Sequence, residues 1–164
     1  MAVALFQNPN VKGEVEFRQK GNGTMVNAFF TELPTGKHGF HIHKAGDLRG
    51  EGCQGACDHW HKGKKTNHGG PPGKTRKRHT GDLGNIEKGK NYSFFLRGVK
   101  VNELYGRSVI VHADEDDLGK GSFPDSLTTG HSGGRIGCAI IGRVVCGSIV
   151  PKRRRISRTR RMKQ

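Results

Sequence analysis

The stretch that decides the fold, residues 13–31, reads Gly13-Glu-Val-Glu-Phe-Arg-Gln19, then Lys20-Gly-Asn-Gly-Thr24, then Met25-Val-Asn-Ala-Phe-Phe-Thr31. Apolar and polar residues partly alternate in both flanks, and a period of two is typical of strands with one buried face. The Gly-Asn-Gly between them is a turn signal. We therefore expect two antiparallel strands joined by a tight turn.

Similar short runs continue on both sides of this hairpin. They cover residues 3–6, 38–43, 83–87, 92–96, 107–113 and 135–145, which brings the number of expected strands to eight. Residues 46–80 and 114–134 lack apolar periodicity, and loops of that length usually carry function. The pattern predicts an all-β fold, an eight-stranded antiparallel Greek-key barrel of the immunoglobulin-like sandwich type, with two long functional loops.

Composition supports one domain and anionic partners. The 164 residues include 26 glycines and only 32% apolar residues, which disfavours a helical bundle. Of the net charge of +15, eight units lie in residues 152–164, which leaves +7 for the rest, and residues 62–78 form a second basic stretch. We expect a domain over residues 1–146 and a basic, disordered tail over 147–164.

The N-terminal residues and the cysteines bear on the compartment. Residues 1–9 lack a secretory signal pattern, and no run approaches a membrane span, so we expect a cytoplasmic protein without membrane contact. The basic tail leaves the nucleus or a nucleic-acid-containing particle as other locations. Without a signal sequence, the four cysteines are expected to be free thiols or metal ligands unless a specific argument supports a bridge.

Histidines are the most informative residues, because most of the nine lie in or beside the two loops and the strands that lead into them. His41 and His43 lie two apart on an expected strand and therefore share a face at chelating distance. A second set combines three imidazoles and one carboxylate, which suits a tetrahedral zinc site: His59, His68, His79 and Asp82. The competing interpretation of both sets is solvated surface histidines.

Ordered motifs along residues 2–145 resemble those of copper/zinc superoxide dismutases. They are Gly39-Phe-His-Ile-His43, Gly52-Cys53, His59, His68-Gly-Gly-Pro71, His79-Thr-Gly-Asp-Leu-Gly-Asn85, Val111-His-Ala113, Asp116-Asp-Leu-Gly-Lys-Gly121 and the segment 129–138. The resemblance implies an enzyme that converts two superoxide anions and two protons to dioxygen and hydrogen peroxide by copper redox cycling, and so protects against oxidative damage.

The resemblance also implies a set of site residues, with one copper and one zinc per subunit. Copper would be held by His41, His43, His59 and His112, and zinc by His59, His68, His79 and Asp82. His59 would then bridge the metals and carry a proton. Arg135 would attract and orient superoxide, Asp116 would join His41 to His68, and Cys53 and Cys138 would form a disulfide. A homodimer is implied, with residues 140–142 in part of its interface.

Other features of the chain have no place in the family pattern or depart from it. Cys57 and Cys146 are expected to be free thiols, and His61 has no assigned role. Thr128 stands where many relatives have a lysine, so substrate steering is expected to rely on the basic loop. His38 and His131 are expected to make structural hydrogen bonds.

Three other functions are compatible with single features of the sequence. The first is a catalytically silent, chaperone-like copper/zinc-binding domain whose tail, residues 152–163, binds nucleic acid or another polyanion. Retention of all six ligand histidines, Asp82 and Arg135 favours the enzyme. A serine hydrolase is excluded because no acid or histidine follows Ser132. A zinc-finger-like module around Cys53 and Cys57 has neither the spacing nor the following helix.

Overall fold

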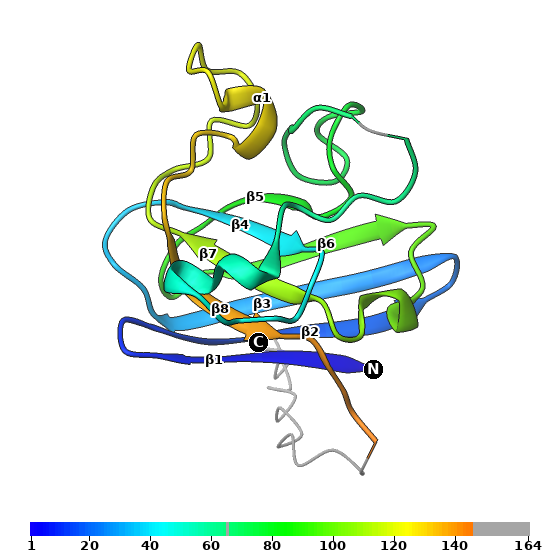
Figure 1. Cartoon of the computed structure of the whole chain (residues 1–164). Coiled ribbons are helices and arrows are strands. Elements are labelled where there is room, and N and C mark those ends of the chain that lie inside the picture. The colour runs from blue at the N-terminus through cyan, green and yellow to red at the C-terminus, as the bar shows by residue number, and fades with distance from the viewer. Residues whose placement is uncertain (65, 146–164) are drawn as a thin grey trace, which may run out of the picture.

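The computed structural model describes residues 1–64 and 66–145 (Figure 1). Its strands are β1 (Ala2–Asn8), β2 (Val11–Lys20), β3 (Gly23–Glu32), β4 (His38–His43), β5 (Asp82–Ile86), β6 (Asn91–Arg97), β7 (Ser108–His112), β8 (Arg135–Ile140) and β9 (Gly142–Arg143). Two 3-10 helices, η1 (Glu51–Ala56) and η2 (Val101–Leu104), and one short α-helix, α1 (Ser126–Thr129), lie between them. All eight expected strands are present.

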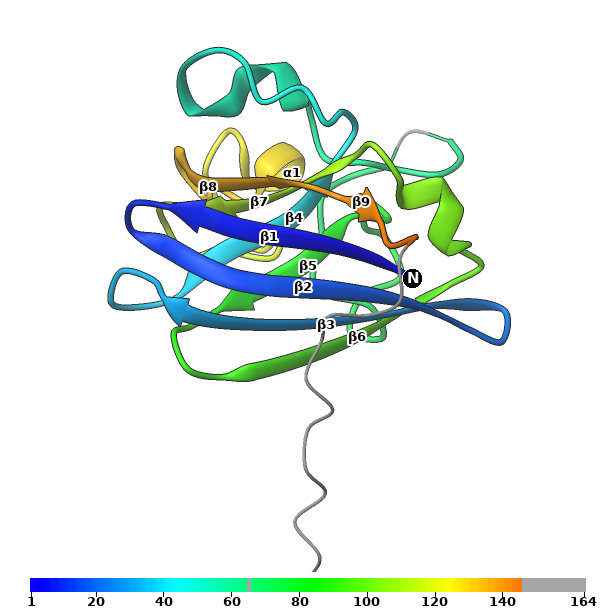
Figure 2. The ribbon, with the colours of Figure 1, turned by 90° about the horizontal axis from the view of Figure 1, so that it is seen from below.

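The strands form two sheets packed face to face, which Figure 2 shows from the side of the five-stranded sheet. The order is β6-β3-β2-β1-β9 in one sheet and β5-β4-β7-β8 in the other, and all pairs are antiparallel. The hairpin of β2 and β3 forms as expected. The sheets are not closed into one barrel, so "sandwich" describes the fold better than the predicted "barrel".

The last predicted strand is in fact two strands in different sheets. The break falls at Ile141, whose side chain is fully buried in the core. Its backbone N–H donates to the carbonyl of Arg107, and its carbonyl accepts from Gly106, so the chain turns away from β7 there. Gly142 and Arg143 then pair with β1. A continuous β-rich run in sequence therefore becomes a crossover between sheets.

The core lies between the sheets and explains the alternation along the strands. Phe6, Phe30 and Phe40 form a chain of edge-on ring contacts, with centroid separations of 5.1 and 5.7 Å. Fully burying one such ring stabilises the fold by about 1.5–3 kcal/mol. On β4, Phe40 and Ile42 belong to this core, whereas His41 and His43 point to the other face.

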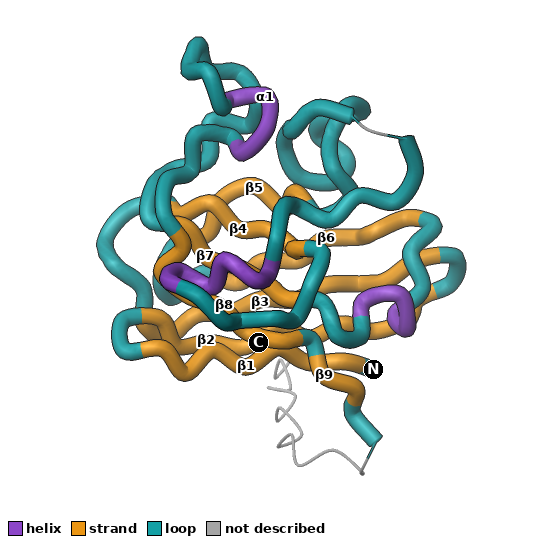
Figure 3. The backbone as a smooth tube through the Cα atoms, in the orientation of Figure 1, coloured by secondary structure: helices purple, strands orange, loops and turns teal. Residues whose placement is uncertain are grey.

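The two long loops lie together over the outer face of the four-stranded sheet, as Figure 3 shows. We call residues 59–81 the metal loop and residues 113–134 the second loop. An isolated antiparallel bridge joins His43 to His59, so the metal loop starts beside β4. A disulfide between Cys53 and Cys138 ties η1 to β8. Because of this cover, every residue of β4 is buried.

Within the described residues, no helix has the length and apolar character needed to cross a membrane.

Candidate metal centre

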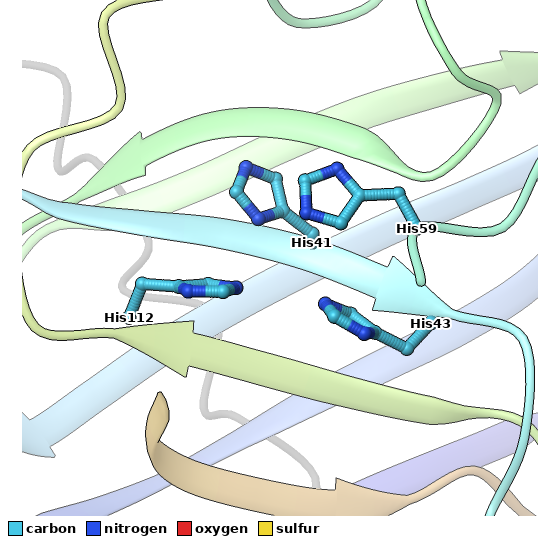
Figure 4. Close-up of side chains that lie close together, drawn as sticks. All are labelled: His41, His43, His59 and His112. Atoms are coloured by element: carbon cyan, nitrogen blue, oxygen red, sulfur yellow. The ribbon is translucent and has the colours of Figure 1, made fainter. Parts of the chain in front are cut away.

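Four histidine rings meet on the outer face of β4 (Figure 4). His41 and His43 come from β4, His112 from the end of β7 and His59 from the start of the metal loop. One nitrogen of each ring lies within 4.8 Å of the corresponding atoms of the other three. All four rings are buried, so the fold assembles a compact nitrogen-rich group away from solvent.

Three of these rings use one nitrogen for a hydrogen bond and leave the other without a partner. The His43 ring donates through Nδ1 to the Cys57 carbonyl across 2.7 Å, and the His112 ring donates through Nδ1 to the Gly133 carbonyl across 3.0 Å. The His41 ring donates through Nε2 to Asp116 across 2.8 Å. The buried atoms left over are His41 Nδ1, His43 Nε2 and His112 Nε2. Buried polar atoms are rarely unpaired, and rings oriented in this way are typical metal ligands.

A second group forms around one oxygen of Asp82, on the other side of His59. The Nδ1 atoms of His59, His68 and His79 lie 2.9, 3.1 and 3.3 Å from Asp82 Oδ1. Ligand atoms about 2.0–2.1 Å from a tetrahedral zinc ion are about 3.3 Å from one another. The other oxygen of Asp82 accepts from the backbone N–H of Gly69 and of His79, at 3.0 and 2.7 Å. The donor set and its spacing therefore fit zinc.

Asp116 connects the two groups. Its Oδ2 accepts from His41 Nε2 and its Oδ1 from His68 Nε2, both across 2.8 Å, and all three side chains are fully buried. These three residues also lie close enough together to hold a metal themselves. However, both oxygens of Asp116 already face ring nitrogens, which leaves the Nδ1 atoms of His41 and His68 for the two larger groups. Asp116 therefore orients one ring in each group.

Burial and charge set the protonation of these residues. Burial lowers the pKa of His41 well below its ordinary value, lowers that of His43 to about 2 and lowers that of His112 to about 3. Burial also opposes a proton on His68, but hydrogen bonds to Asp116 and Asp82 raise its pKa to about 9. Hydrogen bonds from three histidines overcome burial at Asp82 and lower its pKa. The rings of His41, His43 and His112 are thus neutral, the form that binds metals.

Arg135 stands at the start of β8 beside a pocket of about 910 Å³ that reaches the first group. Its Nη1 donates to the Cys53 carbonyl across 2.7 Å and its Nη2 to the Cys57 carbonyl across 2.6 Å. His43, His59 and His112 line the same pocket. A fixed guanidinium therefore faces the space next to the candidate metal ligands.

Several groups that support the site were not predictable from the sequence. Asn85 accepts from the backbone N–H of Asp116 and donates to its carbonyl, both across 2.8 Å, and so holds the segment that carries the carboxylate. It belongs to a quoted motif, but nothing in that motif indicated this role. The carbonyl of Cys57 also serves both His43 and Arg135. A backbone acceptor leaves no signal in residue type.

The remaining histidines make hydrogen bonds outside the two candidate metal groups. The ring of His38 bonds to the carbonyls of His112 and Pro34, and that of His131 bonds to Asp125, as expected. His61, which had no expected role, lines the pocket and accepts from the Thr80 N–H across 3.1 Å.

Comparison with known proteins identifies the family. The family model "copper/zinc superoxide dismutase" matches residues 11–141. The chain belongs to the copper/zinc superoxide dismutase family. It is 46% identical over 149 residues to a Cu-Zn superoxide dismutase of Paramecium bursaria Chlorella virus 1, covering 86% of this chain and 77% of that protein. It is 38% identical to Cu-Zn superoxide dismutase 5 of Dictyostelium discoideum, covering 85% and 95%.

Two further relatives show the range of the family. An extracellular Cu-Zn superoxide dismutase of Brugia pahangi is 40% identical over 151 residues, covering 86% of this chain and 74% of that one. The crystal structure of the clock protein EA4 is similar with a TM-score of 0.77 and 33% identity, covering 86% of this chain and 92% of that one. The two-sheet sandwich is the architecture for which copper/zinc superoxide dismutases are known.

Several expectations are thereby confirmed. This copper/zinc superoxide dismutase is an oxidoreductase that acts on superoxide, and copper and zinc are its cofactors. The Cys53–Cys138 disulfide is present. Because one relative is named extracellular, the cytoplasmic location stays a prediction.

Proposed function

We propose that the group of His41, His43, His59 and His112 holds copper, and that His59, His68, His79 and Asp82 hold zinc. The observation that carries this assignment is the set of buried ring nitrogens without partners, which converge beside β4. Four nitrogens suit copper, whereas three nitrogens and one carboxylate oxygen suit zinc. When bound, copper supplies the one-electron redox chemistry that dismutation requires.

Arg135 binds and orients the substrate in this proposal. A guanidinium keeps its charge at all relevant pH values, and its geometry suits a small anion without making it a metal ligand. Both of its terminal nitrogens are held by carbonyls of the segment between Cys53 and Cys57, so it keeps one orientation. A substrate held beside the copper group thus needs little further ordering.

His59 is the residue that holds and moves a proton. It belongs to both candidate groups, and its Nδ1 faces Asp82 at 2.9 Å. Its Nε2 is left for the copper group, and the residue lines the pocket. A ring held from one side by Asp82 and its neighbours can release or take a proton at the other nitrogen without leaving its place.

The test compares the purified, metal-loaded protein with His112→Ala, Arg135→Ala and Arg49→Ala. We expect the histidine variant to lose copper and activity together, and the arginine variant to keep both metals but react more slowly. Arg49 is a matched control because it is an exposed arginine paired with Asp47. If the fully metal-loaded wild type shows no activity above that of free copper, the proposed enzymatic function is wrong. The protein would then be a catalytically silent metal-binding domain.

We also propose that the protein forms a homodimer through the outer edge of β8. Ile140 is 48% exposed there, and an exposed apolar side chain on an edge strand favours pairing with another chain. Ile141 belongs to the core and cannot contribute its side chain, which corrects the expectation that it forms part of the interface. Sedimentation of wild type and Ile140→Asp tests this, and a wild-type monomer at micromolar concentration would contradict it.

The predictions for the tail concern residues outside the described part of the chain, which ends at residue 145. The boundary between a domain over 1–146 and a tail over 147–164 stays a prediction, as does binding of nucleic acid or another polyanion through residues 152–163. Retention of DNA across a salt series, with and without those residues, tests the second. If the tail neutralises DNA phosphates, retention should fall steeply as the salt concentration rises. A retention profile that does not change when residues 152–163 are removed would contradict binding through the tail.

A further inference from the structure

His61 lies beside the candidate zinc group without belonging to it. Trp60 is buried in the core, whereas His59 and His61 on either side of it line the pocket, which is the alternation of an extended segment. His61 thus faces the same space as the shared ligand. We propose that His61 is a positioning residue for zinc, which acts by holding the backbone of Thr80 between the candidate ligands His79 and Asp82.

Hydrogen bonds join the two ends of the metal loop, and the ring of His61 makes one of them. The backbone N–H of Thr80 donates to His61 Nδ1 across 3.1 Å. Because a backbone N–H can only donate, Nδ1 carries no proton and acts as the acceptor. Beside this contact, the Lys62 N–H donates to the Thr80 hydroxyl across 3.0 Å, and the Gly81 N–H donates to the Trp60 carbonyl across 2.8 Å. His61 therefore belongs to the row of contacts that closes the loop.

Thr80 is the residue through which this contact reaches the zinc group. It directly follows His79 and precedes Asp82 by two positions. The turn between these ligands is closed twice, since the His79 N–H donates to Asp82 Oδ2 across 2.7 Å and the Asp82 N–H donates to the His79 carbonyl across 3.2 Å. The carbonyl of Thr80 accepts from Arg78 Nη2 across 2.9 Å. With His61 on the N–H and Arg78 on the carbonyl, both backbone groups of Thr80 have a partner.

Other roles fit His61 less well. Its ring centre lies 6.0 Å from that of His79, its Nδ1 already faces Thr80, and none of the candidate metal groups among the described residues includes it. It is therefore not an additional metal ligand. A packing role is also disfavoured, because the residue is only partly buried and lines the pocket. The hydrogen bond to Thr80 is thus the contact by which His61 acts on the site.

The inference rests on the proposed zinc site and predicts a selective effect on zinc. Without an acceptor at residue 61, the Thr80 N–H loses its partner, and the turn that carries two zinc ligands is held less firmly. Loss of one hydrogen bond of ordinary strength corresponds to zinc binding that is weaker by about 3- to 10-fold. The copper ligands on β4 and β7 are positioned by sheet pairing instead, so we expect copper affinity to change less.

Substitutions of His61 that differ in hydrogen bonding and in volume test the proposal. His61→Leu and His61→Ala remove the acceptor, whereas His61→Asn keeps one, because the amide oxygen of asparagine is attached to Cγ as Nδ1 is in histidine. Competition with a chelator measures zinc and copper affinity, and the visible absorption of cobalt(II) bound in place of zinc reports the ligand geometry. His131→Ala is the control, since the ring of His131 contacts Asp125 and Phe123 instead.

We expect His61→Leu and His61→Ala to bind zinc about 3- to 10-fold more weakly and to alter the cobalt spectrum, while His61→Asn and the control stay close to wild type. A packing role predicts a different order, in which leucine is best tolerated and alanine and asparagine are both impaired. That order would overturn the inference, as would unchanged zinc affinity in every His61 variant. Equal weakening of zinc and copper binding would indicate a general loss of stability and overturn it too.

His79→Ala separates this inference from the proposed zinc site on which it rests. If His79→Ala binds zinc as tightly as wild type, the proposed site itself is wrong. If His79→Ala loses zinc while His61→Leu and His61→Ala retain wild-type affinity, the site stands and only the role of His61 is refuted.

Discussion

The guanidinium of Arg135 is hydrogen-bonded to the backbone carbonyl of Cys53, with 2.7 Å between Nη1 and the oxygen. Cys53 in turn is linked to Cys138 by the disulfide. Because β8 carries both Arg135 and Cys138, the crosslink holds the carbonyl and the guanidinium in one unit. We therefore expect the disulfide to affect the position of the proposed substrate-binding group as well as the stability of the fold.

The first prediction concerns a Cys53→Ser/Cys138→Ser variant. The two cysteines are 85 residues apart, and the chain-entropy account of such a loop assigns about 4–5 kcal/mol to the crosslink, an upper value. We expect a lower urea midpoint and, in the metal-loaded folded state, slower superoxide removal. An unchanged rate with a lowered midpoint would show that Arg135 keeps its position without the disulfide.

The second prediction concerns Asp116→Asn. The amide that replaces one carboxylate oxygen cannot accept a hydrogen bond, so either His41 or His68 loses its orienting partner. Loss of such a partner typically weakens metal binding 10- to 100-fold, about 1.4–2.7 kcal/mol. Competition with a chelator measures zinc affinity, and Glu115→Gln, an exposed acid paired with Lys37, is the control. Copper affinity is measured in the same way, and equal affinities of both variants for both metals would refute the orienting role.

The third prediction concerns Cys57→Gly. Cys57 has φ 60° and ψ −151°, a conformation essentially reserved for glycine, which costs other residues about 1–3 kcal/mol. Replacement by glycine should remove this cost and so raise the free energy of unfolding. Part of that stabilisation is offset because glycine makes the unfolded chain more flexible. We expect a net stabilisation of about 1 kcal/mol in urea unfolding. Cys57→Ser keeps the Cβ atom and should show no gain, so a similar gain in both variants would point to the thiol instead.

The fourth prediction concerns the pH dependence of the protein after metal removal by a chelator. The pKa values of His43 and His112 are lowered to about 2 and 3, so below about 6.5 the unfolded chain takes up protons that the folded chain does not. Stability should fall as the pH drops from 6.5 to 5. His68 acts in the opposite sense, because its pKa is raised to about 9 and its contribution is lost as the pH rises through that value.

The expected result is a stability maximum between about pH 6.5 and 9, with the steeper loss on the acid side because more histidines have lowered than raised pKa values there. Urea midpoints of the chelated protein between pH 5 and 9.5 measure it. A midpoint that rises from pH 7 to 5 would contradict the assignment of neutral, buried rings.

Much of the fold was predictable from local sequence. The hairpin around Asn22 and Gly23 follows from alternation and turn chemistry, which act between neighbours in the chain. The crossover at Ile141 was not predictable, since nothing local distinguishes an isoleucine that continues a strand from one that leaves it for the core. The choice depends on backbone partners in the segment before β7, at Gly106 and Arg107.

The candidate site also has features that the sequence predicts and features that only the folded chain sets. By itself the sequence determined that His41 and His43 share one face of a strand, and that the metal loop holds three imidazoles and a carboxylate, because residue type sets the donor atoms and the strand period sets the face. Only the tertiary structure decided which nitrogen of each ring stays free. That choice depends on Asp116 and on the carbonyls of Cys57 and Gly133, whose approach is a property of the folded backbone and has no counterpart in side-chain identity.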